Sequence, residues 1–137
     1  MVLEIAETTP EDGKLQAVLG QAQKNGDRAI FDDFLAAGKR LGLHARPYKV
    51  SVMCTAPTNK TRMLFTIWTR PGGTPMWTSS ETFEEFFPGI SADQARRHLG
   101  PDGRRTLDQH SAAQFLSGLE NLFAEAQSEA PGSSGSD

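Results

Sequence analysis

The chain has 137 residues, and its 17 acidic and 14 basic side chains give a formal net charge of −3. Hydrophobic residues make up 37% and charged residues 23%, which is typical of a globular protein with one hydrophobic core. A single cysteine excludes an internal disulfide and a cysteine-rich zinc site, and no apolar run approaches the roughly 20 residues that cross a membrane.

The composition of the two ends predicts one folded domain over residues 9–126. We expect residues 1–8 to form a flexible N-terminus. Residues 127–137 are rich in Gly and Ser and are expected to form a disordered tail, because small polar side chains bury too little surface to offset the entropy of ordering. The N-terminal residues lack the basic and apolar segments of a secretory signal, so we expect a cytoplasmic protein with a reduced cysteine.

Apolar residues at helical spacing predict two helices in the first third of the chain. Pro10 suits the first turn of the first helix, and Gly26 is expected to end that helix. The side chain of Asp27 is expected to cap the second helix, and Gly42 is expected to end it.

Beyond residue 47 the pattern changes to alternation of period two, which predicts β-strands. The expected strands cover residues 48–56, 62–70 and 76–80, and Pro and Gly between them predict turns. The strand at 62–70 carries large apolar side chains on both faces, so we expect it to be central. The arrangement predicted is a three-stranded antiparallel meander.

The last third of the chain is predicted to be helical again. Short helices are expected over residues 82–87 and 91–99, and a long amphipathic helix over 106–126. Ser91 and Thr106 each precede a Gln by three residues, which indicates a capping box at both positions. The fold class is therefore α+β in the order α-α-β-β-β-α-α-α, with the meander packed against the N-terminal and C-terminal helices.

The middle of the chain is strongly basic. Seven Lys and Arg side chains lie between residues 39 and 80, and no Asp or Glu falls in that span. This pattern favours a non-catalytic binding module that holds nucleic acid, another polyanion or an acidic protein surface, through counterion release and aromatic stacking. The expected binding residues are Arg46, Lys49, Lys60, Arg62, Trp68 and Arg70. The alternative is that acidic helices neutralise these cations within the molecule.

Aromatic residues near residue 80 suggest a second hypothesis. Several of them crowd a short helix, and some are expected to remain exposed. They would then form a patch for protein–protein interaction or homodimerisation, composed of Trp77, Phe83, Phe86 and Phe87.

A small enzyme is the third hypothesis, with a site near His44, Cys54 and Glu81. No phosphate-binding loop or nucleophile elbow occurs, and no two histidines have the spacing of a helical metal site. Cys54 lies on an apolar strand face and is better explained as a small buried side chain. We therefore assign no catalytic residue, metal ligand or cofactor.

Overall fold

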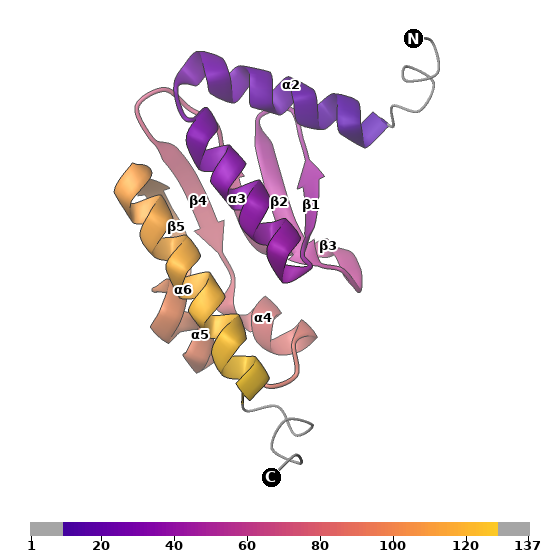
Figure 1. The fold of residues 1–137 in the computed structure, drawn as a ribbon, viewed down its shortest axis with the longest axis vertical. Helices are drawn as coiled ribbons and strands as arrows, with labels where there is room; N and C mark the ends of the chain where they lie inside the picture. The colour runs from indigo at the N-terminus through magenta and orange to yellow at the C-terminus, as the bar shows by residue number, and fades with distance from the viewer. Residues whose placement is uncertain (1–9, 129–137) are drawn as a thin grey trace.

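The computed structural model describes residues 10–128, with side chains from residue 13 to 127, as five helices and a five-stranded antiparallel sheet (Figure 1). The helices are α2 (Pro10–Asn25), α3 (Arg28–Leu41), α4 (Ser80–Phe86), α5 (Ala92–Leu99) and α6 (Gln109–Ser128). The strands are β1 (His44–Pro47), β2 (Ser51–Ala56), β3 (Asn59–Trp68), β4 (Thr74–Thr78) and β5 (Gly103–Leu107). The predicted flexible N-terminus lies outside the described residues, and so does the predicted tail, except for the last two residues of α6.

The mixed α and β class is as predicted, but the three-stranded meander is wrong. The sheet order is β1-β2-β3-β4-β5, and every neighbouring pair is antiparallel. The extra strands lie at the two edges, and β5 follows α5, so the predicted order of elements is also wrong. Both edge strands are short and carry charged side chains instead of an alternating apolar pattern.

Two further expectations about local structure are corrected. Residues 48–50 form the turn between β1 and β2 instead of the start of a strand. Thr106 lies in β5 and does not start the last helix. That helix is preceded by Asp108, whose Oδ1 accepts a hydrogen bond from Ser111 N at 2.7 Å, while Asp108 N donates to Ser111 Oγ at 2.9 Å. The same reciprocal pattern therefore occurs two residues after the predicted position.

Other predicted signals are confirmed. The capping box of α5 is present, with the Ser91 side chain accepting from Gln94 N and the Gln94 side chain accepting from Ser91 N. Gly42 ends α3 in the left-handed conformation, with φ of 77°. The strand β3 is central in the sheet, as its apolar residues on both faces indicated.

The helices α3 and α6 lie side by side across one face of the sheet, and α2 crosses one end (Figure 1). We call this covered side the inner face, and its buried residues are Val52, Cys54, Phe65, Ile67 and Met76. Phe65 contacts the rings of Phe34 on α3 and Phe115 on α6, with centroids 5.7 and 5.3 Å apart. These three rings join both helices to the central strand.

The α4–α5 pair connects β4 to β5 and packs on the C-terminal half of α6 (Figure 1). A side chain at Gly118 of α6 would place its Cβ only 2.1 Å from the carbonyl oxygen of His98 on α5. Glycine is therefore required where these two helices approach each other.

Candidate functional site

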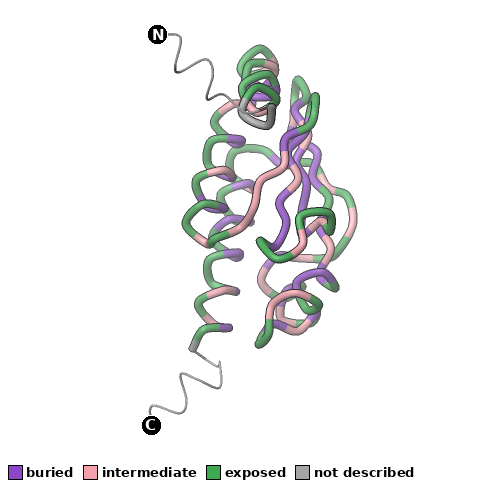
Figure 2. Tube along the Cα trace, turned by 90° about the vertical axis from the view of Figure 1, so that its right-hand side faces the viewer, coloured by how far each residue is buried: buried purple, intermediate pink, exposed green. Residues whose placement is uncertain are grey.

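The second face of the sheet has no counterpart to the long helices, which lie on one side of the sheet only (Figure 2). We call this second side the outer face. The strand register places one side chain from each strand in a single row across it, because directly paired residues point to the same side. The row is Arg46, Met53, Thr66, Trp77 and Arg104.

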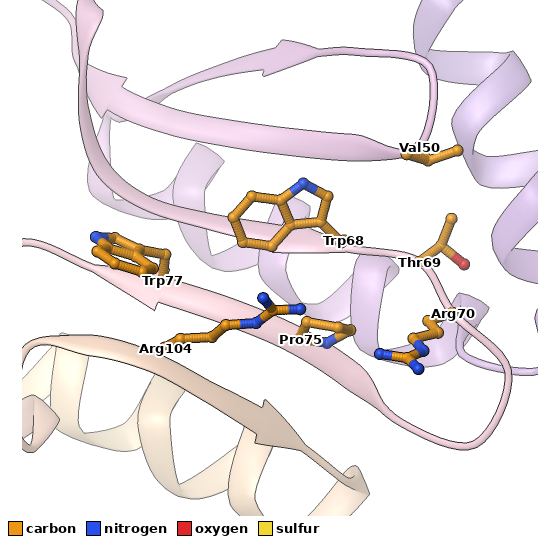
Figure 3. Close-up of a pocket in the computed structure, with 7 residues that line it drawn as sticks. All are labelled: Val50, Trp68, Thr69, Arg70, Pro75, Trp77 and Arg104. Atoms are coloured by element: carbon orange, nitrogen blue, oxygen red, sulfur yellow. The ribbon is translucent and has the colours of Figure 1, made fainter.

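A shallow hollow of about 420 Å³ lies on the outer face (Figure 3). Residues from four segments line it: Val50, Trp68, Thr69, Arg70, Pro75, Trp77 and Arg104. Figure 3 shows the side chain of Arg104 reaching from β5 across β4, and Arg70 extending toward the same hollow from its other end. The hollow is thus lined by two indole rings and by arginine side chains from two segments.

The two tryptophans are diagonal neighbours on adjacent strands. Trp77 on β4 pairs with Thr66 on β3, and Trp68 follows two residues later on β3. Diagonal residues on one face of an antiparallel sheet are about 7–8 Å apart. Trp77 is 44% exposed and Trp68 is half-buried, so both indoles contribute to the lining of a surface that solvent can reach.

The arginines of the outer face differ from Arg28, Arg40, Arg62 and Arg96, each of which pairs with a carboxylate. Among the described residues, no carboxylate forms an ion pair with Arg46, Arg70 or Arg104. Arg46 donates instead to the carbonyl oxygen of Lys60 at 3.2 Å and lies 5.6 Å from the Tyr48 ring centroid. The outer face therefore carries positive charge that no ion pair within the described chain neutralises.

The structure brings some of the predicted binding residues together. Trp68 and Arg70 both line the hollow, and Arg46 lies on the outer face at the edge strand β1. Lys49 is exposed in the β1–β2 turn, directly before Val50 of the hollow.

Two predicted binding residues lie apart from the hollow. Lys60 is at the start of β3, eight residues before Trp68, which is about 26 Å along an extended strand. Arg62 pairs with Glu85 of α4 at 2.8 Å, and its guanidinium carbon lies 5.6 Å from the centroid of the Phe86 ring. At Arg62, a helix carboxylate therefore neutralises the cation within the molecule, which is the alternative given in the sequence analysis.

The four residues of the expected aromatic patch do not form one surface. Trp77 lies on the outer face, whereas Phe83 is fully buried. Phe87 packs against Phe123 of α6, with ring centroids 5.0 Å apart. Phe86 is half-buried beside Arg62.

Sequence reasoning missed Arg104, which belongs to a strand that lacks apolar alternation. It also missed Val50 and Pro75 as lining residues of the hollow. For the outer-face position of Trp77, a sequence signal was available. Met76 and Trp77 alternate along β4, so their side chains lie on opposite faces of the sheet.

The residues of the hypothetical enzyme site do not provide an activated nucleophile. Cys54 is buried on the inner face, and this burial raises the pKa of its thiol from 9.0 to about 12. His44 lies on β1, and Glu81 lies on α4. Within residues 10–128, no group of three His, Cys, Asp or Glu could hold a metal ion, and no helix is long and apolar enough to cross a membrane.

The outer face is thus the part of the described chain where exposed aromatic rings and arginines without carboxylate partners occur together. Such a surface can hold a ligand by stacking and charge–charge contacts, which need no reactive group. No protein-family model, curated protein or solved structure matches this chain.

Proposed function

We propose that the protein is a non-catalytic binding module that holds single-stranded nucleic acid on its outer face. One observation carries this proposal: two diagonal indoles lie in a hollow that Arg70 and Arg104 also line. Indole rings provide a stacking surface for bases of any sequence, and guanidinium groups bind phosphate through paired N–H donors.

The spacing of the indoles favours single strands over duplexes. Successive bases in a stacked strand are about 3.4 Å apart. Trp68 and Trp77 are separated by about twice that distance, as diagonal neighbours in a sheet. Bases that bind both rings must therefore leave the stack, which single strands do easily and duplexes do not.

Charge on the outer face argues against self-association through it. A symmetric dimer brings the same surface of each copy together. Arg46, Arg70 and Arg104 would then face arginines instead of carboxylates, and like charges across an interface are strongly unfavourable. The partner should therefore be anionic.

An acidic segment of another protein is the second candidate partner. Among the residues whose side chains the structure describes, three large hydrophobic ones are exposed by 41–46%, namely Tyr48, Val50 and Trp77. Val50 and Trp77 line the hollow, and Tyr48 lies two residues before Val50. Tyr, Trp and Arg are the residues that most often dominate the energy of protein interfaces.

The test is a fluorescence-anisotropy titration with a labelled 12-residue oligothymidylate and a duplex of the same length, at 50 and 200 mM salt. We expect the single strand to bind more tightly than the duplex. If three arginines contact phosphates, its affinity should fall about twentyfold between the two salt concentrations. Absence of binding at 50 mM salt contradicts the proposal and leaves an acidic protein segment as the candidate.

Variants locate the surface. Trp77→Leu should weaken binding by about 5- to 150-fold, the effect of losing one stacked base. Arg104→Gln should weaken it and reduce its salt dependence. Arg40→Gln is the matched control, because Arg40 lies on α3 and pairs with Glu120 of α6 on the helix side. Equal losses in the control and Arg104→Gln would show that binding is not confined to the outer face.

A further inference from the structure

A buried carboxylate holds the chain beside the hollow. Asp27 lies between α2 and α3, is only 7% exposed, and makes no side-chain cap on α3, contrary to the sequence prediction. Its Oδ1 accepts a hydrogen bond from Thr69 Oγ1 at 2.7 Å. Its Oδ2 accepts from Arg70 N at 3.2 Å and from Thr74 Oγ1 at 2.9 Å. One carboxylate thus binds both ends of the β3–β4 turn.

The hydroxyl of Thr69 has a fixed direction in this network. It donates to Asp27, and it accepts from Asn25 Nδ2 at 2.8 Å. Thr69 and Thr74 are both buried. Since a buried polar group that loses its partner is costly, these contacts allow one arrangement of the turn relative to the α2–α3 junction.

The same turn forms one end of the hollow. Thr69 stands between Trp68 and Arg70 in the chain, and all three line the hollow. Arg70 also borders two adjoining hollows of about 260 and 210 Å³, both lined by Gly72 and Gly73. The backbone of Arg70 is anchored by Asp27, while its side chain is exposed.

We propose that Asp27 is a positioning residue of the outer face: its contacts with Thr69, Arg70 and Thr74 set where the Trp68 indole and the Arg70 guanidinium stand. The effect of this positioning on ligand affinity rests on the proposed function. The positioning itself does not, because it can be measured without a ligand.

The ligand-free experiment uses Trp68 as a reporter. The chain has two tryptophans, so Trp77→Phe leaves Trp68 as the sole indole. Asp27→Asn in this background replaces one acceptor oxygen with an NH₂ group that faces existing donors. We expect increased acrylamide quenching of Trp68 and at least tenfold faster hydrogen exchange of the Arg70 amide. Asp33→Asn is the control, since it removes the same charge from an exposed position of α3.

Unchanged quenching and unchanged Arg70 exchange in a folded Asp27→Asn protein overturn the proposal, whether or not nucleic acid binds. If Asp27→Asn does not fold, Thr74→Val removes only one of the three hydrogen bonds. It should shift both readouts in the same direction by a smaller amount, and no shift would again overturn the proposal.

The ligand experiment separates positioning from a purely structural role. Each arginine–phosphate contact contributes about 0.7 to the slope of log affinity against log salt for single strands. Asp27→Asn and Arg70→Gln should each flatten the slope by that amount, and the double variant should lose little more. An unchanged slope in Asp27→Asn contradicts the proposal. Wild-type protein that binds no oligonucleotide, while both ligand-free readouts respond, contradicts only the proposed function.

Discussion

The inner and outer faces of the sheet are made by alternate residues of the same strands, yet beside the hollow their surroundings differ strongly. On β4, Met76 is fully buried, whereas its neighbour Trp77 is 44% exposed. On β5, the guanidinium carbon of Arg105 lies 5.7 Å from the centroid of the Phe115 ring of α6, whereas Arg104 lines the solvent-exposed hollow. At these positions, the side of the strand that faces the long helices is the one less open to solvent.

The residue types of the two faces fit these surroundings. The inner face is formed mainly by Phe and aliphatic side chains, which bury well without hydrogen-bond partners. The outer face carries Trp and Arg, which combine apolar surface with a polar group and suit partly wetted sites. The inner face thus stabilises the fold, whereas the outer face leaves Trp77, Arg70 and Arg104 exposed to solvent.

The strongest test of this division removes one aromatic ring from each face. Phe65→Ala should lower the free energy of unfolding by about 3–5 kcal/mol, because it empties the space between α3 and α6. Trp77→Ala should lower it by about 1 kcal/mol or less, because the indole is exposed. Urea denaturation measures both, and similar losses would contradict the division.

The close contact between α5 and α6 is tested by Gly118→Ala. In an exposed helix interior this substitution usually stabilises by about 1 kcal/mol. Here the new Cβ would meet the carbonyl oxygen of His98, so we expect a loss of about 1–3 kcal/mol. Gly20→Ala is the control, because Gly20 lies in α2 with nothing within 4 Å of its Cβ position. It should stabilise the protein, and the same sign for both variants would show that α5 and α6 are not in close contact.

The adjacent arginines of β5 give a smaller contrast. Arg105→Gln should destabilise by about 1 kcal/mol, since Arg105 Nη2 donates to the carbonyl oxygen of Pro101 at 2.9 Å and its guanidinium stands over Phe115. The pKa of Arg105 is lowered from its ordinary value, mainly because the guanidinium is partly buried. Arg104→Gln should change the free energy of unfolding by less than about 0.5 kcal/mol. A larger stability loss at Arg104 would mean that it has a structural role.

The last expected effect is confined to alkaline pH, where stability should depend on Cys54. Its thiol has a pKa of about 12 in the folded protein against an ordinary value of 9.0, so the unfolded chain loses this proton at lower pH. The contribution of the protonated thiol to the free energy of unfolding is fully present below pH 9 and is lost as the pH rises toward 12. Cys54→Ala should remove this part of the alkaline loss in urea denaturation at several pH values. An identical pH profile in both proteins would contradict burial of the thiol.

Much of the fold was predictable because its signals are local. The Ser91 capping box and the glycine after α3 depend on contacts within a few residues, and both are confirmed. Alternation of apolar residues indicated β2, β3 and β4 in the correct order. The edge strands β1 and β5 were missed because their pairing depends on distant neighbours, and their own sequences lack apolar alternation.

The candidate site was predictable only in part. Trp68 and Arg70 were identified from aromatic and basic composition, and both line the hollow. Arg62 has equally basic surroundings in the sequence but pairs with Glu85, 23 residues away. Asp27 resembled a helix cap, yet its carboxylate binds groups 42 to 47 residues further along the chain.

The amino-acid sequence by itself determined where most helices and the central strands lie, because spacing, caps and turns act between residues close in the chain. Only the tertiary structure decided which face of the sheet the helices cover, which arginines meet a carboxylate and what Asp27 holds. These features depend on contacts between segments far apart in sequence, and local sequence patterns do not indicate which distant groups come together.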